Sequence, residues 1–283
     1  MTPLPPAWLL ITGTPRLCQF SQQLLPIGLM IRFVRVHDPH LETMKAATAT
    51  STATSTASVA ERPKRKQPLN ATTAAVPDAL LPSNFAWKRP GLAQYLQCRK
   101  AVVHEFAMQP SPVFRGWGSN VYFRDDMADH VQALMVMAVL LELREVIKKH
   151  PSTVSTQIPN DSTLSLSLTI PAMHTSNMIP EKDAHLIEQL DNRNYQSLYS
   201  AIRRHLSSGE HSTIGFDKDA SSEPFLQFDG RVLTNGSSAL THALRSILNL
   251  CQNDQVVTTV YFKHSTLAAN VAYLLQRLCC YLH

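Results

Sequence analysis

One segment, from Asp125 to His150, constrains the fold of this chain more than any other. Its centre, Ala133 to Leu143, reads ALMVMAVLLEL and is apolar on almost every side of a helix. Aspartates stand at its start and lysines at its end, and charges placed in this way interact favourably with the helix dipole. Eleven residues are too few to cross a bilayer. We therefore predict a helix that is buried, either among other helices of the chain or in an interface with a partner.

Four other segments space their apolar residues as amphipathic helices do, whereas two short segments have a pattern that fits strands. Leucine and isoleucine alternate with serine and threonine from Leu164 to Ile170, a strand signal inside a proline-punctuated stretch that an inserted hairpin and a partly disordered loop both fit. Val256 to Phe262 is either a strand or an extended linker. The predicted fold class is mainly α, a helical bundle with a short β-hairpin insertion, and the helical domain carries an insertion at about 151–224. The four helical segments are 91–106, 181–207, 238–251 and 265–278.

Residues 1–82 differ from the rest in composition and charge. Fourteen of the fifteen residues from 46 to 60 are Ala, Thr or Ser, so that stretch has nothing large to bury. A basic cluster, Lys64, Arg65 and Lys66, follows between prolines and fits either a nuclear import signal or a solvated charge run. We predict a disordered basic N-terminal arm over 1–82 and a helical domain over 83–283. The near-neutral charge of that domain predicts nucleic-acid contact that is indirect or weak.

Catalytic, metal and targeting signals are weak throughout the sequence. The five cysteines form no CxxC pair, and no phosphate-loop, dinucleotide, metalloprotease or nucleophile-elbow motif is present. The sequence therefore predicts no catalytic residue, no metal, no cofactor and a protein that is not an enzyme. Ala7 to Ile11 is too short a run to span a membrane. Leu24 to Val36 fits a mitochondrial presequence if translation begins at Met30, or an unprocessed leader.

Three pieces of the chain carry a family resemblance. They are Asn120 to Ala128 with the helix that follows, Phe228 to Gly230 with Leu240 to Leu250, and Phe262 to Asn270 continuing to Leu278. In this order they resemble subunit one of the GINS complex, the replication factor that joins the MCM ring in the replicative helicase. Of the Arg-Asn-basic-Arg-Cys run typical of that family's last helix, this chain keeps Asn270.

The resemblance implies a non-catalytic subunit of a nuclear DNA replication assembly, which binds other protein subunits of a hetero-oligomeric complex. Two alternatives stay open: a mitochondrial assembly or ribosome-associated helical protein, and an enzyme of unrecognised type. Localisation in the nucleus or in the mitochondrion separates the replication subunit from the mitochondrial protein.

We expect the helix from Asp125 to His150 and the C-terminal helix to form the partner interface by hydrophobic packing. An ordinary core helix fits the first of these about as well. The predicted interface residues are Leu134, Val139, Leu140, Leu143, Leu267, Val271, Leu274, Leu275 and Leu278.

Overall fold

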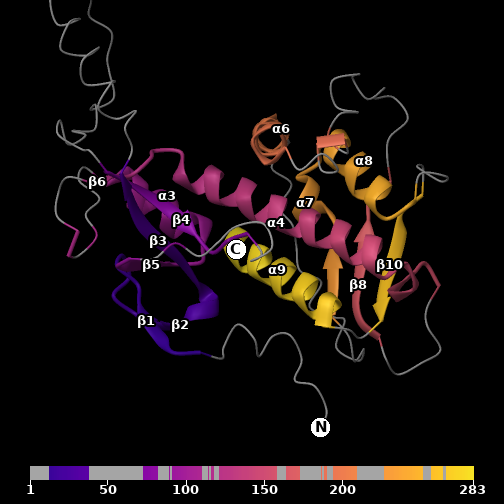
Figure 1. Ribbon diagram of the computed structural model, residues 1–283, viewed down its shortest axis with the longest axis horizontal. Helices are drawn as coiled ribbons and strands as arrows, with labels where there is room; N and C mark the ends of the chain where they lie inside the picture. Colours follow the sequence, from indigo (N-terminus) through magenta and orange to yellow (C-terminus); the bar gives the residue numbers. More distant parts are fainter. Residues whose placement is uncertain are drawn as a thin grey trace, which may run out of the picture. The chain divides into compact units, whose positions relative to one another are not determined.

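The structure is a computed structural model, and the chain divides into two compact units (Figure 1). Of the described residues, those from 13 to 131 with 282–283 form the N-terminal unit, and those from 132 to 281 form the C-terminal unit. The division falls inside a long helix. The residues that the structure describes are 13–37, 73–81, 89, 91–109, 114, 116–117, 121–157, 164–172, 186, 188–189, 194–208, 226–250, 256–263 and 266–283.

A four-stranded sheet forms the framework of the N-terminal unit, with β3 in its interior. β3 pairs antiparallel with both β4 and β5, and β6 pairs parallel with β4. The first five residues of β3 are buried on both faces, which is typical of an inner strand that is covered on two sides. A separate hairpin joins β1 to β2. The strands are β1 Pro15–Leu17, β2 Leu24–Pro26, β3 Met30–His37, β4 Thr73–Asp78, β5 Ala93–Gln97 and β6 Val121–Tyr122, with a 3-10 turn at Ile27–Leu29.

An aromatic cluster fills the core of this unit. Phe106 lies on α3 (Lys100–Met108) and meets Phe114 at a ring-centroid distance of 4.8 Å. Phe33 of β3 lies 5.6 Å from Phe114 and 5.5 Å from Phe123. Aromatic pairs at these distances add to the stabilisation that burial of their area provides. The cluster therefore ties α3 and the loops after it to the sheet.

A buried ion pair crosses from β3 to β4. Arg32 and Asp78 are register partners and form a salt bridge, and both side chains are almost wholly buried. The backbone of Arg89 closes the pair. Its carbonyl oxygen accepts from Arg32 Nη2 at 3.0 Å, and its N–H donates to Asp78 Oδ1 at 3.2 Å. A buried charge requires such compensation, so this pair fixes the register of the two strands.

The sheet of the C-terminal unit has the strand order β7-β10-β8-β9. β10 runs antiparallel to β7 and β8, whereas β9 runs parallel to β8. Leu166 and Leu168 are fully buried opposite Phe262 and Val260, so the Leu–Ser alternation places one side of β8 in the core. The strands are β7 Val154–Ser155, β8 Leu164–Ile170, β9 Leu226–Asp229 and β10 Thr258–Lys263.

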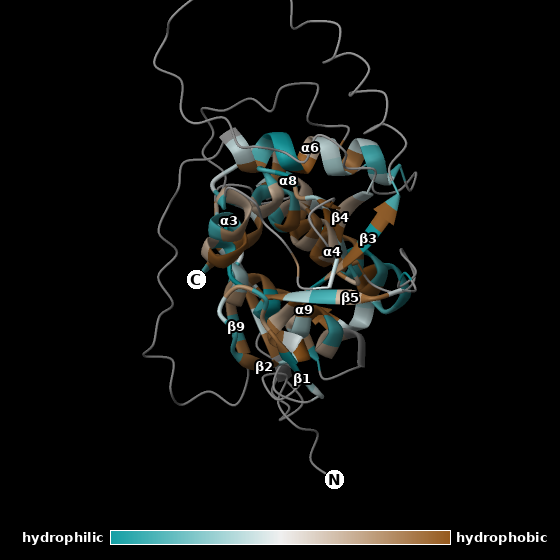
Figure 2. Ribbon diagram, turned by 90° about the vertical axis from the view of Figure 1, so that its left-hand side faces the viewer, coloured by the Kyte–Doolittle hydropathy of each residue, from teal (hydrophilic) through white to brown (hydrophobic). Residues whose placement is uncertain are grey.

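Helices complete the C-terminal unit. The apolar centre of α4 is buried as its sequence predicts, and α6 has polar and apolar sides along its length (Figure 2). Ser237 is the N-cap of α8, and its Oγ accepts a hydrogen bond from the N–H of Leu240. No helix in the described ranges is long and apolar enough to cross a membrane. The helices are α4 Met127–Lys149, α6 Tyr195–Ser208, α7 Arg231–Thr234, α8 Ser238–Ile247 and α9 Thr266–Leu282, with a 3-10 turn at Pro151–Thr153.

The predicted fold class, mainly α with a helical bundle, is wrong. In the part of the chain that the structure describes, ten strands in three sheets stand beside six α-helices, so the fold is mixed α/β. The expected hairpin is also wrong, because β7 and β8 both pair with β10 and not with each other. Strand pairing between residues far apart in sequence, which local periodicity does not reveal, is the physical reason.

The prediction of a disordered N-terminal arm is wrong for the described part of residues 1–82, where β1 to β4 lie. The predicted helix over 91–106 is likewise replaced by β5 and α3, because Ala93–Gln97 pairs with β3. The alanine–threonine–serine run and Lys64, Arg65 and Lys66 fall outside the described residues. The helices predicted at 125–150, 238–251 and 265–278 are confirmed as α4, α8 and α9, and the strand at Leu164–Ile170 is confirmed as β8.

Candidate functional site

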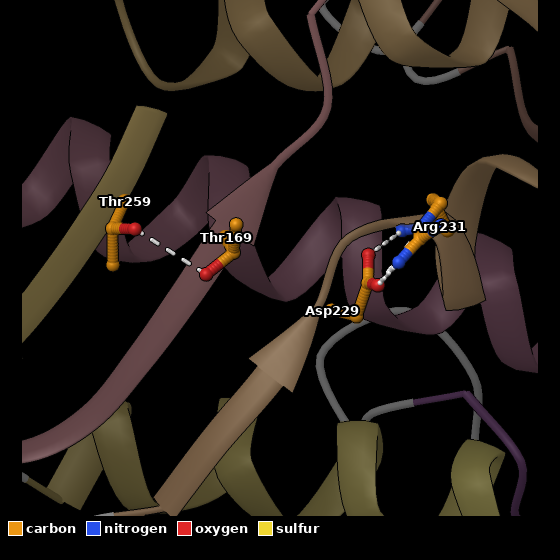
Figure 3. Close-up of polar contacts among 4 residues, drawn as sticks. All are labelled: Thr169, Asp229, Arg231 and Thr259. Carbon is orange, nitrogen blue, oxygen red and sulfur yellow. Dashed lines mark hydrogen bonds and ion pairs between the residues drawn. The ribbon is translucent and has the colours of Figure 1, made fainter. Parts of the chain in front are cut away.

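Polar side chains gather at the carboxyl ends of β8 and β9, which meet at one edge of the sheet because these strands are parallel. Thr169 of β8 is in register with Asp229 of β9 on one side and with Thr259 of β10 on the other (Figure 3). The hydroxyl oxygens of Thr169 and Thr259 share a hydrogen bond of 3.3 Å. Together with Gly230 and Arg231, which follow β9, these residues form what we term the carboxyl-edge cluster.

Within this cluster, Asp229 binds Arg231 through both carboxylate oxygens (Figure 3). The backbone N–H of Arg231 donates to Oδ1 at 2.9 Å, and its Nε donates to Oδ2 at 2.7 Å. The hydrogen bond that the Arg231 side chain donates to Asp229, followed by the negative charge of Asp229, raises the pKa of Arg231. Both side chains are partly exposed, so the pair contributes at most about 1 kcal/mol to stability. Its main effect is to fix the turn from β9 into α7.

Gly230 is required at this turn by space and not by backbone conformation. Its φ of −62° and ψ of −17° are open to any residue. Its N–H donates to the carbonyl oxygen of Thr169 at 2.7 Å, and a Cβ at this position would lie 2.8 Å from the same oxygen. Only glycine allows the turn to approach the end of β8 so closely.

Arg245 of α8 holds the backbone at the same edge. Its side chain is completely buried, and Nη1 donates to the carbonyl oxygens of Pro171 at 3.2 Å and Val256 at 3.1 Å. These carbonyls follow β8 and precede β10, so one guanidinium ties two chain segments together. The planar fork of arginine suits this task better than the point charge of lysine.

A second polar contact lies between α4 and α9. Glu142, the one charged residue in the apolar centre of α4, is only 3% exposed. Its Oε1 accepts from Asn270 Nδ2 at 3.3 Å, and its Oε2 has no hydrogen-bond partner in the described structure. Burial raises the pKa of Glu142, while the Asn270 donor and Lys149 lower it and Glu145 raises it further. Asn270, which the resemblance singled out, thus binds a carboxyl of its own chain.

The cysteines of α9 are thiols at neutral pH. Burial, followed by the nearby Cys280 and Asp229, raises the pKa of Cys279 to about 12, and burial also raises the pKa of Cys280. A thiol in this state is a poor nucleophile and a poor metal ligand. Across the described ranges, no group of three His, Cys, Asp or Glu side chains is placed to hold a metal ion.

The predicted interface residues occupy three kinds of position. Leu134 of α4 and Leu274 of α9 keep part of their surface exposed. The side chain of Leu267 and the basic residues Lys64, Arg65 and Lys66 lie outside the described part. The interface role of the set stays a prediction. Six of its members are buried within the chain: Val139, Leu140, Leu143, Val271, Leu275 and Leu278.

Sequence reasoning missed the residues that organise these sites. Glu142 interrupts an apolar run, which is a visible signal of a buried carboxyl. Arg245 and Gly230 carry no such signal, because each acts on a strand distant in sequence.

Comparison of the chain with protein-family models, with curated proteins and with solved structures finds no match.

Proposed function

We propose that this chain is a non-catalytic subunit of a nuclear DNA replication assembly related to the GINS complex. The observation that carries the binding role is on α9, where Leu274 stays partly exposed beside the buried Val271, Leu275 and Leu278. The apolar side of this helix is therefore wider than the core of the chain uses. A leucine at the margin of a buried face fits contact with a further apolar surface.

The polar groups support a structural role over a catalytic one. Catalytic acids and bases combine a shifted pKa with access to substrate. Glu142 has a raised pKa but is buried, Cys279 is held as a thiol, and Asp229 is bound by Arg231 through both oxygens. In each case the group binds or packs against its own chain.

The replication assignment is supported by the three sequence pieces. The first runs into the start of α4, the second from β9 to α8, and the third from the end of β10 into α9. Each of the three pieces therefore includes strand residues, from β6, β9 and β10, ahead of its helix. For this reason the assignment rests on the residues of the pieces and not on a shared fold.

A tagged full-length chain tests the proposal by location and by partner. We expect nuclear fluorescence, and we expect the remaining GINS subunits to co-purify in constant ratio to the chain. A mitochondrial location with ribosomal or assembly proteins in constant ratio would contradict the proposal and favour the alternative reading of the Leu24 to Val36 segment.

A further inference from the structure

We propose that the contact between α4 and α9 is a pH-dependent switch, in which protonated Glu142 holds α9 in place and ionised Glu142 weakens its hold. This device goes beyond a role as a passive subunit. The release of α9 is a property of the chain alone, and only its link to a partner rests on the proposed function.

The geometry suits a protonated carboxyl better than a carboxylate. Two oxygens of an ionised carboxylate accept about four hydrogen bonds between them. At Glu142 one oxygen has a single neutral donor, Asn270 Nδ2 at 3.3 Å, and the other has none in the described structure. Glu142 is 3% exposed, so bulk solvent supplies few further donors. A buried charge with so few donors destabilises its surroundings.

The charged groups around Glu142 do not offset this burial. Lys149, on the same helix, lowers the pKa of Glu142, but Lys149 is itself paired with Glu145 at 2.7 Å, and Glu145 raises the pKa. From α9 the facing group is the neutral Asn270. Arg277, the charged residue of α9, stands seven positions further along, about 10 Å in helical rise. Burial therefore dominates, and the pKa of Glu142 is raised above its ordinary value of 4.5.

The sign of the pH effect follows from this direction. Below about pH 4.5 the carboxyl is protonated whether α9 is packed or open, so the contact has its full stability. As the pH rises, the open form ionises first and the packed form keeps its proton. The equilibrium then shifts toward the open form, by up to about tenfold per pH unit, until the raised pKa is passed.

Opening of α9 would uncover apolar residues that the closed chain buries. Val271, Leu275 and Leu278 are all fully buried in the closed form. These residues belong to the interface set predicted from the sequence. A partner that binds them would thus compete with the Glu142 contact and be favoured as the pH rises.

Hydrogen exchange of the full chain without any partner tests this inference. Deuterium uptake of peptides from α9 is measured between about pH 5 and about pH 8 and corrected for intrinsic exchange. We expect α9 protection in the wild type to fall with pH by up to about tenfold per unit. In the Glu142→Gln variant, whose side chain cannot ionise, the protection of α9 should not change with pH. Glu105→Gln, the same change at an exposed site on α3, should behave as the wild type.

A second variant tests the role of the hydrogen bond to Glu142. Asn270→Ala removes the donor to Glu142 and should lower α9 protection more at pH 8 than at pH 5. The inference is overturned if wild-type α9 protection is independent of pH, or if Glu142→Gln shows the same fall. It is also overturned if all helices of the C-terminal unit lose protection together with α9. None of these results bears on whether the chain joins a replication assembly.

Discussion

Gly230→Ala is the substitution whose cost the structure defines best. The added Cβ would lie 2.8 Å from the carbonyl oxygen of Thr169 and 3.3 Å from Cδ of Pro171. An ordinary contact begins near 3.4 Å, so the turn after β9 must move by about 0.6 Å from β8. The hydrogen bond from the Gly230 N–H to the same oxygen, now 2.7 Å, would lengthen toward its limit.

The magnitude follows from three contributions. Overpacking of this kind costs about 1–3 kcal/mol, and the weakened hydrogen bond costs about 1 kcal/mol. Because the φ and ψ of Gly230 suit alanine, the lower entropy of the unfolded chain returns about 0.4–1 kcal/mol. We therefore expect a net loss of about 2 kcal/mol in the free energy of unfolding, or roughly 4–8 °C in melting temperature for a unit of this size.

Urea denaturation followed by far-ultraviolet circular dichroism measures this loss. The comparison is Gly91→Ala, where a Cβ meets nothing within 4 Å but φ is +118°, so that its cost comes from backbone strain in the N-terminal unit. Hydrogen exchange should place the loss from Gly230→Ala in β8, β9 and α7. If Gly230→Ala is as stable as the wild type, the close approach of the turn to β8 is refuted.

Two further predictions concern buried groups of the C-terminal unit. Arg245→Met should lower the free energy of unfolding by about 2 kcal/mol, because the carbonyl oxygen of Pro171 loses its guanidinium donor. An unchanged urea midpoint would show that this hydrogen bond does not stabilise the unit. Cys279 should react with iodoacetamide at pH 8 at least about 100-fold more slowly in the folded chain than in urea, since its pKa is about 12. Equal rates by mass spectrometry would contradict its burial.

Local signals in the sequence predicted those elements whose stability is decided locally. α4 carries acidic residues at its start, lysines at its end and an unbroken apolar centre, and it lies within two residues of the predicted bounds. β8 was predicted as a strand from its Leu–Ser alternation. Its pairing was not predicted, because β10, for which the pattern allowed either a strand or an extended linker, follows about ninety residues later and β9 about sixty later. Periodicity identifies the face that a strand buries but not the strand beside it.

The N-terminal unit shows the same limit more severely. β3 has arginines within an apolar run, a pattern that also fits a presequence, and only pairing with β4 and β5 makes it an inner strand. Arg32 is neutralised by Asp78, forty-six positions away. In the C-terminal unit, Gly230 and Arg245 act through contacts with backbone carbonyls of strand ends that are distant in sequence. No local sequence pattern predicts such contacts.

An adjacent pair of leucines on α9 tests the central claim most directly. Leu275 is completely buried and Leu274 is partly exposed, so the same substitution separates core from interface. Melting temperature and the amount of co-purified GINS subunits are measured for Leu274→Asp, Leu275→Asp and Leu92→Asp, the last an exposed leucine of the N-terminal unit. We predict that Leu274→Asp keeps the melting temperature and loses the partners, that Leu275→Asp unfolds the chain, and that Leu92→Asp changes neither. Full retention of the partners by a folded Leu274→Asp chain would contradict the proposed role of α9 as a subunit interface.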